Sequence, residues 1–103
     1  MKKRESYTTP EMMESIIGCK WSLHVLNEIQ QGNRRPGKLE KSAKNLSRKV
    51  LTERLKKLVA FGILEKKSFP VIPPKVEYFL TPFGRKFSHL IRAIYKLENQ
   101  GRN

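Results

Sequence analysis

Few side chains in this sequence have the types and spacing that catalysis or metal binding requires. The chain of 103 residues contains one cysteine, Cys19, and two histidines, His24 and His89. Cys19 and His24 lie five residues apart, which puts them on different faces of a helix, and His89 is far from both in the sequence. The sequence also has no glycine-rich phosphate-binding loop and no pair of carboxylates suited to acid–base chemistry. We therefore predict that the protein is not an enzyme and uses no metal ion and no cofactor.

A different chemistry is open to the polar and basic residues that follow position 46. Arginine and lysine can pair with guanine, threonine can contact the thymine methyl group, and glutamate can accept a hydrogen bond from cytosine N4. A carboxylate repels phosphate, so Glu53 on a basic surface favours the reading of base sequence over simple backbone binding. The alternative is that Glu53 pairs with Lys57 one helical turn later. The candidate base-reading residues are Ser47, Arg48, Lys49, Thr52, Glu53 and Lys56.

These residues need a helix to position them, and the sequence predicts one over residues 47–61. Ser47 is a suitable N-cap and Gly62 a suitable C-terminal stop. On a helical wheel the polar residues fall opposite a broad apolar stripe. The stripe consists of Val50, Leu51, Leu55, Leu58 and Val59. We expect the stripe to enter the core and the polar face to stay free for the major groove of DNA, which is roughly 12 Å wide.

Basic residues outside that face are candidates for contacts with DNA phosphates. They lie in a turn after the second predicted helix, on the long helix itself and around a predicted hairpin, from where they can flank a groove. Such contacts position a protein on DNA without specifying a sequence. The candidates are Arg34, Arg35, Lys38, Lys57, Lys66, Lys67 and Lys75.

The remaining elements are predicted from apolar periodicity, caps and chain breakers. They are helices over 12–17, 21–30 and 38–44, strands over 63–69 and 75–80, and a last helix from Pro82 to about Leu97. Prolines at 70, 73 and 74 cannot donate to a sheet, so the hairpin tip should be a stiff protruding loop. The order of elements predicts a winged helix-turn-helix, a mainly α fold with a small β-hairpin (α+β).

The last helix, over residues 82–98, carries an apolar seam. Residues 83, 87, 90, 94 and 97 are spaced by 4, 3, 4 and 3 positions, as in a heptad repeat. Such a seam packs either on the protein's own core or on a second chain, and we favour a homodimer that uses residues 82–98 as its dimerisation helix. The predicted interface residues of this helix are Phe83, Phe87, Leu90, Ile91, Ile94 and Leu97.

Length and charge indicate one small domain with a polyanionic partner. Residues 1–103 are expected to form a single domain preceded by a flexible arm at 1–9. The net charge is +13, of which residues 31–60 carry +8 and residues 61–103 carry +5. We expect double-stranded DNA as the partner, and the alternative is a non-specific basic nucleic-acid-binding or ribosome-associated module. No apolar run is long enough to cross a bilayer, so we expect a cytoplasmic protein with no membrane partner.

Three segments resemble the signature segments of HxlR-type winged helix-turn-helix transcriptional regulators, a MarR-like family. They are IGCKW at 17–21, LSRKVLTERL at 46–55 and PPKVEYFLT at 73–81, and the resemblance spans residues 8–98. The resemblance implies a bacterial or archaeal, nucleoid-associated DNA-binding homodimer. Its recognition helix would be 47–61, and its wing, over 63–80, would lie on the flanking backbone or minor groove. Two-fold symmetry predicts an inverted-repeat operator. The resemblance also implies that the first helix contributes to the dimer, which adds Met12, Met13 and Ile16 to the interface.

The sequence departs from the family pattern at its cysteines. Many members carry a Cys-Pro pair near the N-terminus, which in some of them senses electrophiles or oxidants, but Thr8 and Thr9 occupy that place here. That chemistry is therefore not implied. Cys19 is the one redox candidate, and it is either a buried inert thiol, which we favour, or a thiol mildly activated by Lys20. A cavity between the dimer helices could admit a small-molecule effector, but no residue identifies one.

Overall fold

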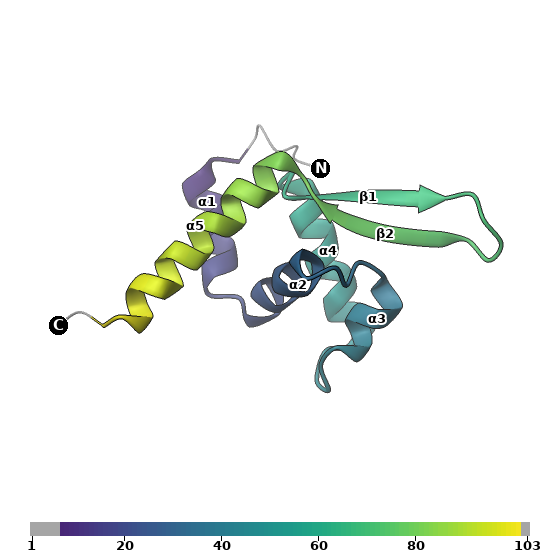
Figure 1. Cartoon of the computed structure of the whole chain (residues 1–103), viewed down its shortest axis with the longest axis horizontal. Helices are drawn as coiled ribbons and strands as arrows, with labels where there is room; N and C mark the ends of the chain where they lie inside the picture. Colours follow the sequence, from purple (N-terminus) through teal and green to yellow (C-terminus); the bar gives the residue numbers. More distant parts are fainter. Residues whose placement is uncertain (1–6, 102–103) are drawn as a thin grey trace.

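The computed structural model describes residues 7–101, which form helices around one core and a hairpin that projects from it (Figure 1). The elements are α1 (Thr9–Ile17), α2 (Lys20–Gln30), α3 (Pro36–Lys41), α4 (Arg48–Ala60), β1 (Leu64–Phe69), β2 (Lys75–Leu80) and α5 (Pro82–Asn99). The strands pair antiparallel, with Leu64 opposite Leu80 and Phe69 opposite Lys75. The predicted fold class, a mainly α winged helix-turn-helix with a small hairpin, is confirmed.

The first helix begins earlier than the apolar pattern predicts. The Thr8 side chain accepts a hydrogen bond from the Glu11 N–H (3.2 Å), and the Glu11 carboxylate accepts one from the Thr8 N–H (2.7 Å). This reciprocal capping box fixes the start of α1 at Thr9. The predicted arm over 1–9 is therefore wrong at its C-terminal end, because Thr8 and Thr9 belong to the start of α1. Residues 1–6 of that arm lie outside the described residues.

The long helix α4 has the cap and the stop that the sequence predicts. The Ser47 hydroxyl accepts a hydrogen bond from the Val50 N–H at 3.1 Å. Gly62 adopts a φ of 76°, a left-handed conformation that glycine reaches without strain, and the chain turns there toward β1. Within the predicted apolar stripe, Val59 is 37% exposed, so this residue lies at the edge of the stripe and outside the core.

The helices enclose a core that fixes α4 in place. Leu39 of α3 and Leu46 in the turn after it are buried, so the short polar helix is held against the same core as α4. The buried side chains of the helices and of the chain around Gly62 are Met12, Ile16, Val25, Leu26, Ile29, Leu39, Leu46, Leu51, Leu55, Leu58, Phe61, Ile63, Phe87 and Ile91. Burial of this apolar surface is the main force that positions the polar face of α4 outward.

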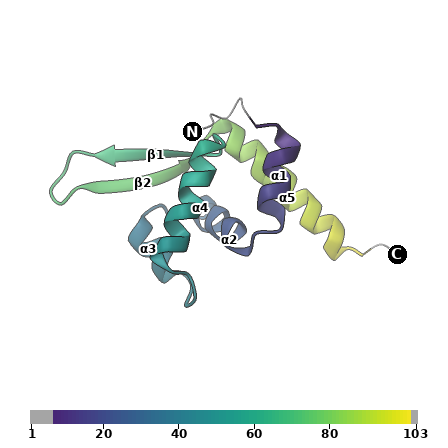
Figure 2. The same ribbon diagram turned by 180° about the vertical axis from the view of Figure 1, so that it is seen from behind.

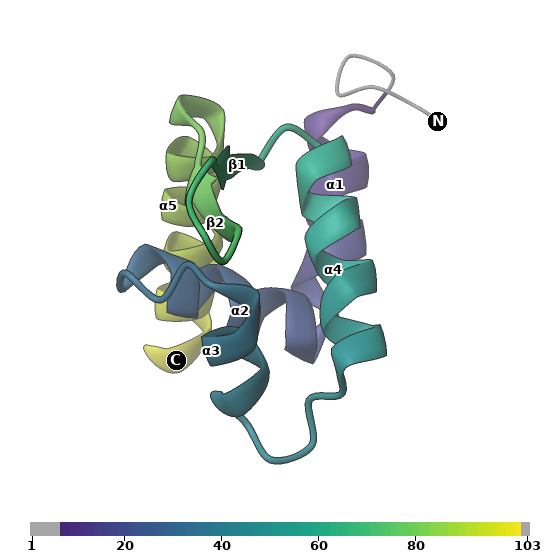
Figure 3. The same cartoon turned by 90° about the vertical axis from the view of Figure 1, so that its right-hand side faces the viewer.

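The hairpin is anchored at its base and projects at its tip. Leu64 and Tyr78 are buried, and the Tyr78 N–H donates a hydrogen bond to the Arg34 carbonyl at 2.9 Å, which joins the segment before α3 to the edge of β2. Figures 1 and 2 show that the strands then extend away from the helices. In Figure 3 the hairpin and α4 both lie on the side that faces the viewer. The fold thus presents a helix and a projecting hairpin to one side of the molecule.

The apolar seam of α5 is partly buried in the core and partly exposed on the surface. Phe87 is 1% exposed and Ile91 is 8% exposed, because both pack on the core of their own chain. Leu90, Ile94 and Leu97 are 50%, 42% and 69% exposed. The C-terminal part of α5 extends beyond the other helices (Figure 1).

The predicted dimer contacts are therefore partly wrong. Met12, Ile16 and Phe87 are at most 1% exposed, so they have no surface to offer a second chain and instead stabilise the protomer. Met13 and Phe83 are half-buried against the same core. The predicted contacts that remain on the surface are Leu90, Ile94 and Leu97, with Ile91 at their edge.

Candidate nucleic-acid interface

One face of α4 is polar, exposed and uncovered by any other element in the described part of the chain (Figure 3). Within residues 7–101 four of its side chains make no ion pair and no side-chain hydrogen bond with other residues. Ser47, at the start of this helix, is exposed as well, but its hydroxyl is occupied as the cap of α4. The free side chains on this face are Lys49, Thr52, Glu53 and Lys56. The structure therefore gathers most of the predicted base-reading residues on one accessible surface.

Arg48 is the exception among them, because it is already paired. Its Nη2 lies 2.8 Å from Glu40 Oε1, and its Nε donates to the same oxygen at 2.9 Å. Glu40 belongs to α3, so this pair links the two helices of the helix-turn-helix. The Arg48 side chain is nonetheless 72% exposed. Sequence reasoning missed the pair, because Glu40 lies eight residues away and on a different helix.

Glu53 does not form the alternative pair that the sequence allowed. No ion pair joins Glu53 to Lys57 among the residues that the structure describes, although the two lie one turn apart on α4. Both side chains are exposed. Glu53 is therefore free to accept a hydrogen bond from an external donor, as the base-reading interpretation requires.

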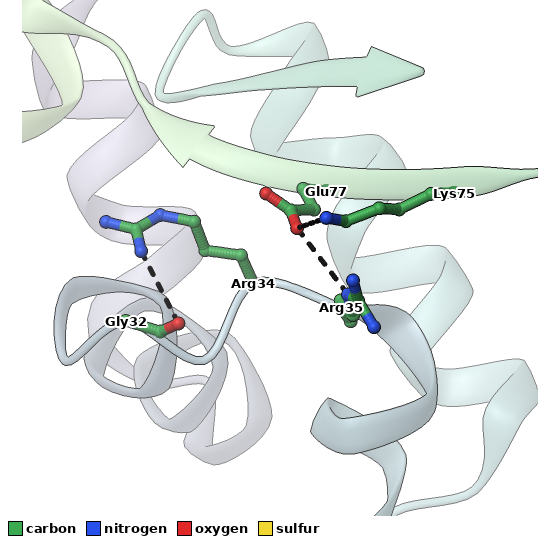
Figure 4. A network of polar contacts seen from close by, with 5 residues as sticks. All are labelled: Gly32, Arg34, Arg35, Lys75 and Glu77. Carbon is green, nitrogen blue, oxygen red and sulfur yellow. Dashed lines mark hydrogen bonds and ion pairs between the residues drawn. The ribbon is translucent and has the colours of Figure 1, made fainter. Parts of the chain in front are cut away.

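Midway along the hairpin, Glu77 lies between two of the predicted phosphate-binding residues. Figure 4 shows the Glu77 carboxylate between Lys75 Nζ, at 3.2 Å, and Arg35 Nε, at 3.5 Å. Partial burial opposes ionisation of the carboxyl group, but the hydrogen bonds and charges of Lys75 and Arg35 outweigh this effect and hold the pKa of Glu77 below its ordinary value. The carboxylate thus neutralises part of the positive charge that the sequence assigned to DNA. Sequence reasoning missed this contact, because Arg35 and Glu77 are 42 residues apart.

Arg34 is turned toward the hairpin instead of into solution. Its guanidinium lies 5.0 Å from the centre of the Phe79 ring, and its Nη1 donates to the Gly32 carbonyl at 3.4 Å (Figure 4). The main chain of Arg34 also accepts the hydrogen bond from Tyr78 described above. The side chain is half-buried. Arg34 therefore joins α2 to the wing, and its predicted role as a phosphate contact stays a prediction.

The other predicted phosphate contacts are more accessible. Lys67 Nζ forms an ion pair with Glu65 Oε1 at 3.5 Å and lies 4.8 Å from the centre of the Phe79 ring. The rest are exposed and unpaired within residues 7–101: Lys38 on α3, Lys57 on α4 and Lys66 on β1. These cations lie on three different elements around the polar face of α4, where they could flank a groove.

Cys19 occupies the N-cap of α2 and is half-buried. Burial raises the pKa of its thiol, but the neighbouring polar groups of Ser22, the positive charge of Arg54 and the backbone of Trp21 together leave the pKa below its ordinary value. A lowered pKa favours the thiolate form, and the choice between an inert and a mildly activated Cys19 stays a prediction. The pKa is lowered by Ser22 and Arg54 and not by Lys20, the neighbour that sequence reasoning proposed.

Within residues 7–101, no group of three histidine, cysteine or acidic side chains is placed to hold a metal ion. In the same part of the chain no helix has the length and the apolar character to cross a membrane. What the described surface does offer is a helix of suitable width for the major groove, with polar side chains along its outer face.

Comparisons with known proteins agree with this arrangement. An HTH-type transcriptional regulator of Synechocystis is 44% identical over 82 residues, which cover 80% of this chain and 61% of the relative. The HTH-type transcriptional regulator YtcD of Bacillus subtilis is 31% identical over 91 residues, which cover 88% of this chain and 72% of the relative. The chain thus spans about three fifths of the first relative and about seven tenths of the second. These relatives are transcriptional regulators and not enzymes, as the residue types predicted.

The fold and the family are shown independently. The crystal structure of a MarR-family transcriptional regulator from Enterococcus faecalis V583 matches with a TM-score of 0.80 at 30% identity, covering 97% of this chain and 88% of the other. The family model of the HxlR-like helix-turn-helix matches residues 16–103. The matched region contains the uncovered α4 face, the hairpin and α5, so the chain belongs to the HxlR-like helix-turn-helix family.

Proposed function

We propose that this chain is a sequence-specific DNA-binding transcriptional regulator that acts as a homodimer on an inverted-repeat operator. In this proposal α4 enters the major groove, and the hairpin of β1 and β2 lies on the flanking backbone or the minor groove. The sequence-specific readers are the side chains on the free face of α4, and the lysines of α3, α4 and the hairpin contact phosphates.

The observation that carries the proposal is the free face of α4. A surface that only needs to bind phosphate is served best by cations, whereas this face combines Lys49 and Lys56 with Thr52 and Glu53. None of these side chains is used within the described chain, and donors, acceptors and a methyl group lie side by side on one helix. That mixture suits the edges of base pairs, each of which presents its own pattern in the major groove.

The homodimer rests on the exposed half of the α5 seam. Leu90, Ile94 and Leu97 form an apolar strip on a helix that extends beyond the rest of the chain. A separate groove of about 550 Å³ lies between α2 and α5 and is lined by Leu23, Leu26, Ile91 and Tyr95 among others, but by none of the strip residues. A second copy of α5 would cover the strip. The two recognition helices would then read half-sites about one helical turn apart, roughly 34–36 Å, or a multiple of it.

The net charge of +13 by itself also suits a non-specific basic module, so the decisive experiment is selection. Sheared genomic DNA of the source organism is incubated with the protein at about 0.15 M salt, and the retained fragments are sequenced. We expect enrichment of one short inverted repeat. Retention of DNA without enrichment of any sequence would contradict the proposal and support the non-specific module, which would then be tested on RNA.

A pair of matched variants tests which surface is used. Lys56→Ala removes a lysine from the free face of α4, and Lys86→Ala removes another exposed lysine, from α5. We expect Lys56→Ala to weaken binding to the selected repeat by about tenfold and binding to random duplexes much less, since a good base contact is worth 1–3 kcal/mol. Lys86→Ala should affect both duplexes slightly and equally. If Lys56→Ala weakened binding to the selected repeat no more than Lys86→Ala does, Lys56 would not read a base.

A further inference from the structure

The tip of the hairpin carries an apolar group that the fold itself does not use. Ile72 is 100% exposed, and Val71 beside it is 50% exposed. Both lie at the end of the molecule that is farthest from the C-terminal part of α5 (Figure 1). The other large exposed apolar side chains are on α4 and α5, so the tip is a separate apolar site within the described chain. An isoleucine in this position adds nothing to the core of its own protomer.

The backbone of the tip is stiff and poor in hydrogen-bond donors. Pro70, Pro73 and Pro74 have fixed φ angles and no N–H group, and the Val71 N–H is already bonded to the Phe69 carbonyl at 2.9 Å. A partner strand therefore cannot add to this loop as it would to a sheet edge. Two exposed side chains are also far too few for a protein interface, which takes about 800 Å² from each partner. The tip is suited to insert one side chain into a narrow groove, because its stiff backbone loses little conformational entropy on binding.

Charge and reach point to DNA as the occupant. The two strands of the stem contain Lys66, Lys67 and Lys75, of which Lys67 and Lys75 pair with Glu65 and Glu77, so the stem below the apolar tip keeps a small excess of positive charge. Each strand has six residues, which at about 3.3 Å each gives the hairpin a length of roughly 20 Å. That length is close to half a turn of B-DNA, about 17 Å, the step from a major groove to the adjacent minor groove. Proteins that bind the minor groove commonly insert isoleucine, leucine or proline between base pairs.

We propose that Ile72 is an apolar wedge that enters the minor groove beside the α4 half-site and unstacks one base step there. The inference rests on the proposed function, since it requires α4 to bind the neighbouring major groove. Lys66, the lysine of the stem that is unpaired within residues 7–101, would hold a phosphate beside the groove, while the prolines limit the backbone freedom of the tip. A base step that unstacks easily would be preferred at this place, so Ile72 would add specificity outside the bases that α4 contacts.

The test uses the tightest duplex from the genomic selection, with each adenine of the flanks replaced in turn by the fluorescent base 2-aminopurine. At saturating protein we expect the fluorescence to rise severalfold at one flanking step, because unstacking relieves the quenching of this base. Ile72→Ala should abolish the rise and weaken binding by about tenfold. Ile72→Leu, which keeps an apolar side chain of similar size, should retain the rise. Since Ile72 is fully exposed, neither variant should change thermal stability.

Lys67→Ala is the matched control, because it removes a charge from the stem and leaves the tip intact. It should weaken binding, yet at saturation the 2-aminopurine signal should equal that of the native protein. The wedge is overturned if the native protein binds without a fluorescence change at any flanking position, or if Ile72→Ala gives the native signal. If titration of the duplex with the native protein gave no anisotropy change, the protein would not bind it, and this result would contradict both the proposed function and the wedge.

Discussion

At the scale of single residues, the pair between Arg48 and Glu40 offers a test of the DNA contact proposed for the start of α4. Glu40→Gln removes a negative charge beside the free face and releases the guanidinium. We expect this variant to bind every duplex severalfold more tightly at about 0.05 M salt, because one more cation can reach a phosphate or a base. Folding should change little, since exposed ion pairs contribute about 0–1 kcal/mol. Anisotropy titrations of native and variant protein give the comparison.

Arg48→Ala completes the experiment on this pair. If Arg48 reads a base, the variant should lose about 1–3 kcal/mol on the selected repeat and tolerate changes at one operator position. The same variant in the Glu40→Gln background should lose more, because the guanidinium released there contributes more to binding. If instead Glu40→Gln weakened specific binding, the carboxylate would be a positioning group for Arg48, and release of the guanidinium would not be the governing effect.

Cys19 gives a second prediction at this scale. The ultraviolet absorbance of the thiolate, followed against pH, should show a midpoint below that of an ordinary cysteine, because Ser22 and Arg54 stabilise the charged form more than burial opposes it. Arg54→Gln should raise the midpoint by removing a positive charge. Lys20→Gln, a neighbour in sequence that does not contribute, is the control and should leave it in place. A midpoint that moves with Lys20 and not with Arg54 would contradict this account.

At the scale of elements, Gly84 fixes how α5 leaves the hairpin. A Cβ at this position would overlap the carbonyl oxygen of Ile63, which belongs to the backbone and cannot move aside. We expect Gly84→Ala to destabilise the protein by about 3 kcal/mol. Gly37→Ala in α3 is the matched control, because an added Cβ meets nothing within 4 Å there. It should be neutral or stabilise by about 0.4–1 kcal/mol, and urea denaturation of both variants measures the difference.

The elements were predictable because their signals are local. The cap at Ser47 and the stop at Gly62 each act within a few residues, and the structure shows both. The apolar period of α5 was also correct, but a period cannot tell which partner covers it. Phe87 faces the core of its own chain, whereas Leu97, at the same spacing, extends beyond that core. Which of them is buried depends on where the rest of the fold ends.

The site was predictable to the extent that it lies on one element. The free face of α4 follows from amphipathicity, since side chains opposite an apolar stripe must face outward. The contacts of Arg48 with Glu40 and of Arg35 with Glu77 join different elements, so no spacing in the sequence indicates them. For the same reason Arg34 was expected to be a free cation, and the structure instead places it against Phe79.

At the scale of the whole molecule, the described chain is elongated and has different surfaces at its two ends. Its extents are 55 × 33 × 22 Å, with the hairpin tip at one end of the long axis and the C-terminal part of α5 at the other (Figure 1). The residues proposed to contact DNA lie on α3, α4 and the hairpin, whereas the apolar strip of Leu90, Ile94 and Leu97 lies on α5. This separation lets a second copy bind α5 without covering the face proposed for DNA.

A double substitution on α5 tests whether the two ends work together. Ile94→Asp with Leu97→Asp places two charges in the exposed apolar strip, where they oppose association but leave the core of the protomer intact. We expect a folded monomer at micromolar concentration by light scattering. Its affinity for a single half-site should be unchanged. Its affinity for the full inverted repeat should fall by about 100-fold or more, because the second half-site is no longer bound at high effective concentration.

Ile94→Met with Leu97→Met keeps the strip apolar and should remain dimeric with native affinity for the full repeat. The comparison separates the dimer from the DNA contact. If the aspartate variant stayed dimeric, association would use another surface. If it became monomeric yet bound the full repeat as tightly as the native protein, dimerisation through α5 would not contribute to operator binding, and each subunit would read its half-site alone.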